Sequence, residues 1–196
     1  VWEIRDKETL DMAMESAMTW HLVFSTVHTN SAAETITRVY NLWAKPYMLA
    51  GTFTLVMAQR LLRKLNPATK LHVSVKDTQF YQWASKNLEA FAPDVLKEEV
   101  AVRWITPEQW NAFVKDGMAY VPVDENGYAG RVGLFEMMDY TADIKNLLLN
   151  GKSAFEVEDY ALQHGMINLE RDGIFKVIQG EISLDELYRL VKPKYV

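Results

Sequence analysis

The stretch "HLVFSTVHTN", residues 21–30, sets two histidines at the ends of a short apolar run. β-Branched and aromatic residues fill the middle of the run, which is the composition of a fully buried strand. The polar residues from His28 onward then fall just past the C-terminal end of that strand, where open α/β sheets bind their ligands. The stretch therefore predicts a strand that either delivers polar groups to a site or simply ends at the surface. Spacing alone favours the second interpretation.

The first six residues, "VWEIRD", repeat this layout, with a short apolar lead followed by Glu3, Arg5 and Asp6. If the two segments form neighbouring strands, Glu3 and His28 lie close together at one edge of the sheet. A carboxylate there can orient or deprotonate a water molecule, and a histidine there can donate a hydrogen bond to a phosphate. The two segments together therefore predict a candidate acid–base site.

The composition narrows the class of protein. A chain of 196 residues that is 49% hydrophobic and 24% charged can form one domain or two small ones. A net charge of −5 argues against a broad nucleic-acid interface, which needs a basic face. The sequence has no cysteine for disulfides or zinc, and His21 and His28 do not have a standard metal-ligand spacing. The longest apolar stretch, residues 47–58, is shorter than the roughly 20 residues that span a bilayer, so no direct membrane insertion is expected.

Helical patterns surround the two predicted strands. Apolar periodicity predicts helices over residues 7–18 and 31–42, and the second opens with the capping-box pattern Ser31-x-x-Glu34. A longer helix is predicted over residues 47–65, with basic residues in its last turn. Strands and helices that alternate in this way predict a βαβ-type layer and an α/β fold.

Residues 66–127 differ in character and hold four of the six prolines, which predicts a small α+β insert. A strand is predicted over residues 100–105, followed by a helix that a capping box opens at Thr106. A strand over residues 128–138 and helices from residue 141 onward complete the chain. The predicted caps of these last helices are Ser153, Gly165, Gly180 and Ser183. The apolar residues expected to form the core of the insert are Phe80, Trp83, Leu88, Phe91, Val100, Val102, Trp104, Trp110 and Phe113.

Five stretches in register resemble the type II secretion and type IV pilus assembly ATPases. They are "EIRDKET", "HLVFSTVHTN", "QRLLRKL", "GYAGRVGLFEM" and "GMINLERDGIFKVIQGEISLDEL". The resemblance implies the C-terminal part of a RecA-like P-loop ATPase domain with a small α+β insert and a helical C-terminal subdomain. It places the second part of the ATPase core at residues 1–65, the insert at 66–127, and the returning strand with the helical subdomain at 128–196.

The resemblance also implies the residues of a site. Glu3 matches the catalytic glutamate of the family's Walker B segment, and His28 matches the histidine that lies by the γ-phosphate. His21 would support the site from the start of the strand. Arg5 and Asp6 would have supporting roles at the nucleotide site.

The function implied is that of a hexameric cytoplasmic motor, peripheral at the inner membrane, that hydrolyses ATP with Mg²⁺. Hydrolysis would drive pilus assembly or type II-like protein secretion, and catalysis would rest on positioning and electrostatics. The implied partners are other copies of the chain in a homo-hexamer, an inner-membrane platform protein and the cytoplasmic domain of an inner-membrane assembly protein. Pilus, secretion system and conjugative pilus all fit, and no nucleic-acid partner is expected.

The sequence departs from the family pattern in its nucleotide-binding motifs. No G-x-x-x-x-G-K-[ST] loop occurs, and the chain begins in apolar sequence, which predicts a fragment cut inside a strand. This fragment alone is therefore predicted to be inactive. Trp2, Trp20 and Trp43 stand where the family usually has glycine, and Trp2 would crowd the space beside the phosphates. Trp2 thus favours an alternative function, a catalytically inactive interaction or regulatory module that docks on the membrane platform, whereas Glu3 and His28 disfavour it.

The family's metal module is also altered. Its two CxxC pairs fall, by register, on residues that are not thiolates: Asn66, Thr69, Tyr120 and Val123. A tetrahedral zinc site cannot form from them, so no zinc is expected. The aromatic residues of the insert are expected to replace the metal's contribution to folding.

Overall fold

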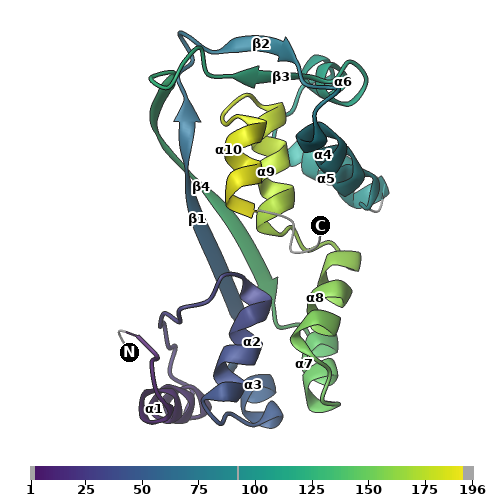
Figure 1. Cartoon of the computed structure of the whole chain (residues 1–196). Coiled ribbons are helices and arrows are strands. Elements are labelled where there is room, and N and C mark those ends of the chain that lie inside the picture. The colour runs from purple at the N-terminus through teal and green to yellow at the C-terminus, as the bar shows by residue number, and fades with distance from the viewer. Residues whose placement is uncertain (1–2, 92, 192–196) are drawn as a thin grey trace. The chain divides into compact units, whose positions relative to one another are not determined.

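The computed structural model describes residues 3–91 and 93–191, which form two compact units of mixed α/β structure (Figure 1). The first unit spans Val1–Ala58 and Glu136–Met166, and the second spans Gln59–Phe135 and Ile167–Val196. Strands β1 (Leu55–Leu65) and β4 (Tyr128–Asp139) pair with each other, and each contributes residues to both units. Residues 66–127 thus fall wholly in the second unit, whereas the chain after β4 is divided between the two.

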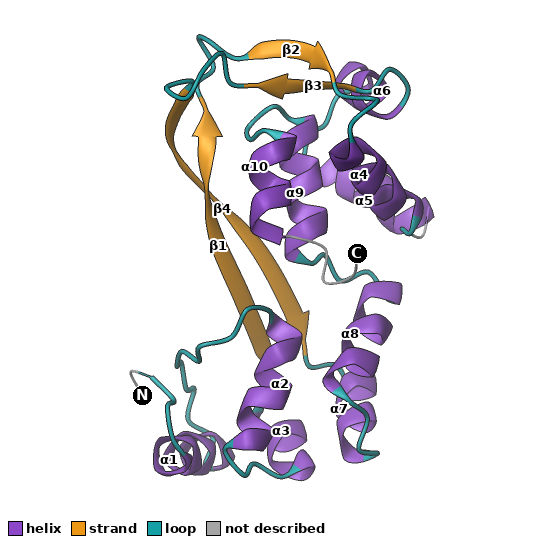
Figure 2. Ribbon diagram, viewed as in Figure 1, coloured by secondary structure: helices purple, strands orange, loops and turns teal. Residues whose placement is uncertain are grey.

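The first unit is built mainly of helices, coloured purple in Figure 2. Its helices are α1 (Lys7–Met18), α2 (Ala32–Asn41), α3 (Pro46–Thr52), α7 (Ala142–Leu149) and α8 (Ala154–Gln163). Helix α3 packs against α7 and α1, and α2 packs against α8. Their apolar faces meet in one core, whose fully buried members include Leu10, Met14, Ile36, Leu49 and Leu148.

Local capping explains why these helices begin where they do. The Ser31 hydroxyl accepts from the N–H of Glu34 at the start of α2, and Ser153 and Glu156 form a reciprocal capping box at α8. The predictions of helices over 7–18 and 31–42 are confirmed within one residue at each end. Among the described residues, no helix combines the length and the apolar character needed to cross a bilayer.

The prediction of a buried strand over residues 21–27 is wrong. This segment has no regular strand structure, although the N–H of Ile4 donates to the carbonyl of Thr26 at 2.9 Å. Val23 and Val27 pack against the core of the first unit, whereas Leu22 and Phe24 are largely exposed. A strand needs a neighbouring strand to bond with, and β-propensity alone does not provide one.

The prediction of one helix over residues 47–65 is also wrong. Helix α3 ends at Thr52, and the chain continues as β1 from Leu55 to Leu65. Val56 is the β-branched residue of β1, and most of the other residues there favour helices, so the deciding cause is the partner that β1 finds in β4, more than 60 residues later. The prediction of a strand over residues 128–138 is confirmed by β4.

The second unit has a small antiparallel sheet with helices packed beside it (Figure 1). Its strands β2 (Leu71–Ser74) and β3 (Met118–Val121) pair with Leu71 opposite Val121 and Ser74 opposite Met118. The helices are α4 (Gln79–Glu89), α5 (Pro93–Val102), α6 (Pro107–Val114), α9 (Leu169–Ile178) and α10 (Leu184–Val191). Thr106 and Gln109 form the predicted capping box at α6, and Gly165 and Gly180 end α8 and α9 as expected.

The strand predicted over residues 100–105 is instead the last turn of α5 and the turn after it. Pro93 sets the φ angle of the first helical position, and Val95, Leu96 and Val100 then fall on one face that packs on the core. Alternating valines therefore gave a misleading period-two pattern.

The predicted core of the insert is correct in most positions and wrong in two. Phe80, Trp83, Leu88, Phe91, Val100, Trp110 and Phe113 belong to the core cluster of the second unit or pack against it. Val102 and Trp104 are exposed instead; Val102 is the last residue of α5, and Trp104 lies in the turn after it. The core is also shared with α9 and α10: the rings of Phe91 and Phe175 lie 5.6 Å apart, and those of Phe80 and Tyr188 lie 4.5 Å apart. The segment is therefore not held by aromatic residues of its own alone.

Candidate functional site

Glu3, Arg5 and His28 form one cluster in the first unit. The Glu3 carboxylate lies 2.5 Å from the Arg5 guanidinium through Oε2 and 2.7 Å from His28 Nε2 through Oε1. The Glu3 side chain is 19% exposed, whereas those of Arg5 and His28 are 74% and 85% exposed. The predicted proximity of Glu3 and His28 is thus observed, even though their two segments do not form a regular sheet.

The backbone explains why these side chains meet. The hydrogen bond from Ile4 to the carbonyl of Thr26 holds the two segments together one residue beyond Glu3 and two residues before His28. Ile4 is buried in the first core, which fixes the direction of the adjacent carboxylate. The result is a carboxylate near the surface, flanked by two groups that can face an anionic ligand.

The charges around Glu3 keep it ionised. The hydrogen bond from Arg5 is the main cause that lowers the pKa of the Glu3 carboxyl, and the charges of Arg5 and His28 act in the same direction. Glu3 can therefore accept a proton or a hydrogen bond from water at neutral pH.

Replacing Arg5 by alanine is expected to raise the pKa of Glu3 toward the ordinary value of 4.5. Because the folded-state pKa is lowered, the pair stabilises the fold above the ordinary carboxyl range, and this contribution disappears as the pH falls through the lowered pKa. Carboxyl carbon NMR titration measures the change, with Lys7→Ala as the control. An unchanged Glu3 pKa in Arg5→Ala would contradict the assignment of the cause.

The other two predicted site residues, Asp6 and His21, bond with residues other than Glu3. Asp6 is the N-cap of α1, where its carboxylate accepts from the backbone N–H and the hydroxyl of Thr9, each at 2.9 Å. These bonds lower the pKa of Asp6. His21 Nδ1 lies 3.1 Å from the Thr19 hydroxyl, just after the end of α1. The structure thus brings together Glu3, Arg5 and His28, and gives Asp6 and His21 local contacts of their own.

Sequence reasoning assigned no role to Glu136, which the structure ties to the start of α2. Its side chain is buried on β4, and its Oε1 accepts from the N–H of Ala32 at 2.7 Å, where α2 begins. The available signal was the acidic residue inside the apolar run "VGLFEMM", because a carboxylate that ends in a core needs a partner there.

The comparison with protein families gives the context of this cluster. The family model described as "Type II/IV secretion system protein" matches residues 1–189. The chain belongs to this family. The resemblance inferred from the five sequence stretches is therefore confirmed.

Named relatives within the secretion family include pilus and secretion ATPases. The chain is 36% identical over 190 residues to the type IV pilus assembly ATPase PilB of Acinetobacter baylyi, across 97% of this chain and 30% of that protein. It is 30% identical over 192 residues to the type II secretion system protein E of Xanthomonas campestris, across 98% of this chain and 30% of that protein. The chain thus spans about 30% of the length of these two relatives.

The fold is similar to that of two solved ATPase structures. The X-ray structure of the Legionella pneumophila ATPase DotB superposes with a TM-score of 0.60 at 18% identity, covering 98% of this chain and 37% of that one. The Yersinia pseudotuberculosis ATPase DotB gives a TM-score of 0.58 at 21% identity, covering 97% of this chain and 36% of that one. These two likenesses show the fold.

The residues around Glu3 can be compared with the groups that an ATPase needs to bind its nucleotide. Arg5 and His28 are exposed beside an ionised carboxylate, which suits the terminal phosphate and the water that attacks it. The sequence contains no glycine-rich loop whose backbone amides would hold the other phosphates. The residues of this chain therefore fit the γ-phosphate end of the nucleotide.

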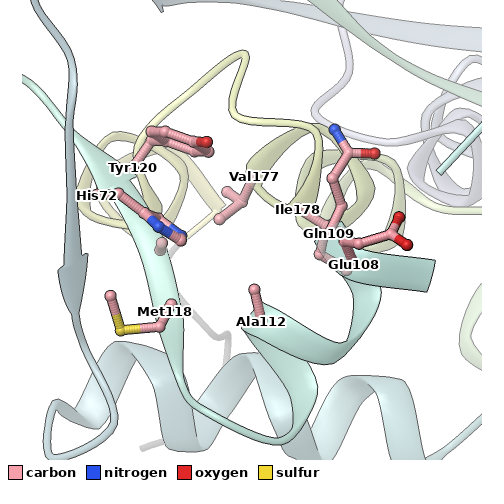
Figure 3. A pocket seen from close by; sticks show the side chains of 9 residues that line it. His72, Glu108, Gln109, Ala112, Met118, Tyr120, Val177 and Ile178 are labelled. Carbon is pink, nitrogen blue, oxygen red and sulfur yellow. The ribbon is translucent and has the colours of Figure 1, made fainter. Parts of the chain in front are cut away.

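The second unit contains a small cavity (Figure 3). Its volume is about 180 Å³, below the roughly 300 Å³ at which ligand pockets begin. His72 stacks on Tyr120 at its edge, with ring centroids 4.5 Å apart. The lining residues are His72, Glu108, Gln109, Ala112, Met118, Ala119, Tyr120, Val177 and Ile178.

Purified protein is expected to hold no stoichiometric zinc, and EDTA is expected to leave its melting curve unchanged. At the former ligand positions, Asn66 uses its Oδ1 to accept from the N–H of Ala68 at 3.0 Å, and Tyr120 stacks on His72. Within the part of the chain that the structure describes, no three acidic or histidine side chains form a metal cluster. Elemental analysis beside a known zinc protein is the measurement. One equivalent of tightly held zinc would refute the expectation.

Proposed function

We propose that this chain is the C-terminal portion of a hexameric cytoplasmic motor ATPase, RecA-like in fold, that drives pilus assembly or type II-like protein secretion. The observation that carries the proposal is the family match over residues 1–189, together with the Glu3–Arg5–His28 cluster on the segments that resemble the Walker B and histidine boxes. The remaining parts of the nucleotide site would come from sequence outside these 196 residues.

In the proposed reaction, a water oxygen attacks the γ-phosphorus of ATP and the bond from that phosphorus to the bridging oxygen breaks. The Glu3 carboxylate, held ionised by Arg5, orients the water and takes its proton. His28, whose Nε2 contacts Glu3, donates a hydrogen bond to the γ-phosphate from its other ring nitrogen, Nδ1. Asp6 supports the site by fixing the start of α1, and His21 supports it from the start of its segment. A Mg²⁺ ion bound with the nucleotide would neutralise phosphate charge.

The proposed partners follow from the motor role. They are other copies of the chain in a homo-hexamer, an inner-membrane platform protein and the cytoplasmic domain of an inner-membrane assembly protein. The motor would lie peripherally at the inner membrane. Mg²⁺-dependent ATP hydrolysis by the full-length protein is the test. A full-length protein that binds the platform protein but does not hydrolyse ATP would favour the alternative of a regulatory module.

The 196-residue chain by itself is expected to bind ATP weakly or not at all, and not to turn it over. Backbone amides and a lysine of a glycine-rich loop supply most of the phosphate affinity in this type of site, and the sequence has no such loop. Calorimetry with ATP and Mg²⁺ on this chain, beside the full-length protein, measures the difference. Micromolar affinity of the chain alone would overturn the expectation.

A further inference from the structure

Three positions in the described residues have a left-handed backbone without being glycine, and all three are tryptophan. They are Trp20 (φ 69°), Trp43 (φ 71°) and Trp104 (φ 59°). A residue with a Cβ is strained in this conformation, and a bulky aromatic residue there is an outlier. The other left-handed positions are glycines: Gly117, Gly130, Gly151, Gly165 and Gly180.

The three tryptophans occupy the same place in the same motif, directly after the C-caps of α1, α2 and α5. Each donates its own N–H to a carbonyl of the last turn, and the next residue donates to a carbonyl one residue earlier. These latter bonds run from His21 to Ser16 (3.2 Å), from Ala44 to Val39 (3.1 Å) and from Ile105 to Val100 (3.1 Å). This is the Schellman motif, whose left-handed residue is usually glycine.

Three other helices end in the same way with glycine. Gly151, Gly165 and Gly180 follow the C-caps of α7, α8 and α9, and the residue after each glycine makes the corresponding bond. Those bonds run from Lys152 to Leu147 (3.1 Å), from Met166 to Ala161 (2.9 Å) and from Glu181 to Lys176 (2.9 Å). The left-handed backbone and the bond made by the following residue are therefore of the same kind at both sets of positions.

Nothing in the packing of the three indoles offsets the strain. Trp20, Trp43 and Trp104 are 98%, 73% and 86% exposed. Trp83 and Trp110 behave differently: they lie inside α4 and α6 and pack, partly buried, against the core of the second unit. The tryptophans that the structure describes therefore occupy two kinds of position, one suited to an indole and one suited to glycine.

From the left-handed backbone at positions 20, 43 and 104 we infer that these residues are glycine in the working protein, encoded by UGA codons that the source organism reads as glycine. UGA is the codon that one bacterial code reads as tryptophan and another as glycine, whereas UGG is the ordinary tryptophan codon. Trp83 and Trp110 are then encoded by UGG. Trp2 lies outside the described residues. Its codon is expected to be UGA as well, which would leave glycine beside Glu3.

The direct test is the gene and the protein from its own cells. Codons 20, 43 and 104 are expected to be UGA, and codons 83 and 110 to be UGG. By mass spectrometry, peptides of the native protein are expected to have the mass of glycine rather than tryptophan at positions 20, 43 and 104. At positions 83 and 110 they are expected to have the mass of tryptophan. UGG at any of the first three codons, or tryptophan in any of those three native peptides, would overturn the inference.

A stability measurement tests whether tryptophan is strained at positions 20, 43 and 104. Trp20→Gly, Trp43→Gly and Trp104→Gly are each expected to lower the equilibrium constant for unfolding roughly fivefold, since relief of the left-handed strain exceeds the added freedom of the unfolded chain. Trp83→Gly and Trp110→Gly are the matched controls and are expected to raise that constant, because they lose helix propensity and packing. Destabilisation by the first three substitutions would contradict glycine at those sites.

A second inference rests on a different observation, the buried carboxylate of Glu136. Glu136 is 2% exposed on β4, and its Oε1 accepts from the N–H of Ala32 at 2.7 Å. That N–H belongs to the first turn of α2, where the helix dipole and the unpaired amides favour negative charge. The carboxylate therefore anchors the start of α2 to a strand that is distant in the sequence.

The loop that carries His28 is fastened to the same helix start. The N–H of Asn30 donates to the Glu34 carboxylate at 2.9 Å, and the hydroxyls of Thr29 and Thr35 lie 3.1 Å apart. Movement of the start of α2 would therefore move residues 28–31. We propose that Glu136 is a positioning residue that holds His28 against Glu3, an inference that rests on the proposed function.

The experiment compares Glu136→Ala with Glu136→Gln in the full-length protein. Glu136→Ala is expected to lower kcat for ATP hydrolysis roughly tenfold or more with KM unchanged, because His28 is displaced. Glu136→Gln keeps an oxygen acceptor and is expected to retain most of kcat. Glu156→Ala, which removes the similar bond to the Ser153 N–H at α8, is the matched control and should leave kcat unchanged.

A second readout separates this inference from the proposed function. In the 196-residue chain, Glu136→Ala is expected to shift the His28 ring resonances and to speed hydrogen exchange at Ala32, whereas Glu156→Ala should do neither. Unshifted His28 resonances, or an unchanged kcat in an active full-length Glu136→Ala protein, would overturn the positioning role. A full-length parent without ATPase activity refutes the proposed function instead, and shifted His28 resonances would still support the link to Glu136.

Discussion

Replacing Glu3 by glutamine in the full-length protein is expected to lower kcat for ATP hydrolysis by roughly 10²–10⁴-fold, which is the usual contribution of a general base. Glutamine has nearly the same shape but cannot take a proton from water. ATP binding should persist, because the phosphates would be held mainly by groups outside this chain. The contact of Glu3 with Arg5 and His28 makes this the substitution with the largest expected effect on activity.

Single-turnover kinetics and calorimetry on the same samples separate chemistry from binding. Glu8→Gln is the matched control, since Glu8 is an exposed carboxylate in the first turn of the neighbouring helix α1. His28→Ala should also reduce turnover, by removal of the group proposed to face the γ-phosphate. If Glu3→Gln hydrolyses ATP like its parent, the catalytic assignment fails and the regulatory module becomes the better proposal.

Truncating Phe113 to alanine is expected to destabilise the second unit by about 3–5 kcal/mol, the usual range for a buried phenylalanine. Phe113 is 1% exposed, and its ring packs at 5.4 Å from that of Tyr81 in the core shared by α4, α6 and α9. Its removal leaves a cavity that the surrounding helices and strands can fill only in part.

Trp104→Ala is the matched control, because it truncates a larger ring in the same unit. The Trp104 side chain lies almost wholly in solvent, and alanine keeps the left-handed strain, so a change within about 0.5 kcal/mol is expected. Urea denaturation, monitored through hydrogen exchange of the backbone amides in α4 and α9, reports the stability of this unit. Equal losses from the two truncations would contradict the burial pattern described above.

The local part of this fold was predictable from the sequence alone. Helix starts at Ser31, Thr106 and Ser153 were predictable because a capping side chain bonds within three or four residues of itself. The family and the meeting of Glu3 with His28 were predictable as well, because the motifs that carry them are contiguous stretches in a fixed order.

Only the tertiary structure decided the rest, because the deciding partners are distant in the sequence. Residues 55–65 are a strand because β4 pairs with them, although their spacing also suited a helix. The bond of Glu136 goes to an amide 104 residues away, and Trp104 is exposed although the sequence suited it to the core. Composition and periodicity describe what a segment can do; which neighbour satisfies its hydrogen bonds and covers its apolar face is a property of the whole chain.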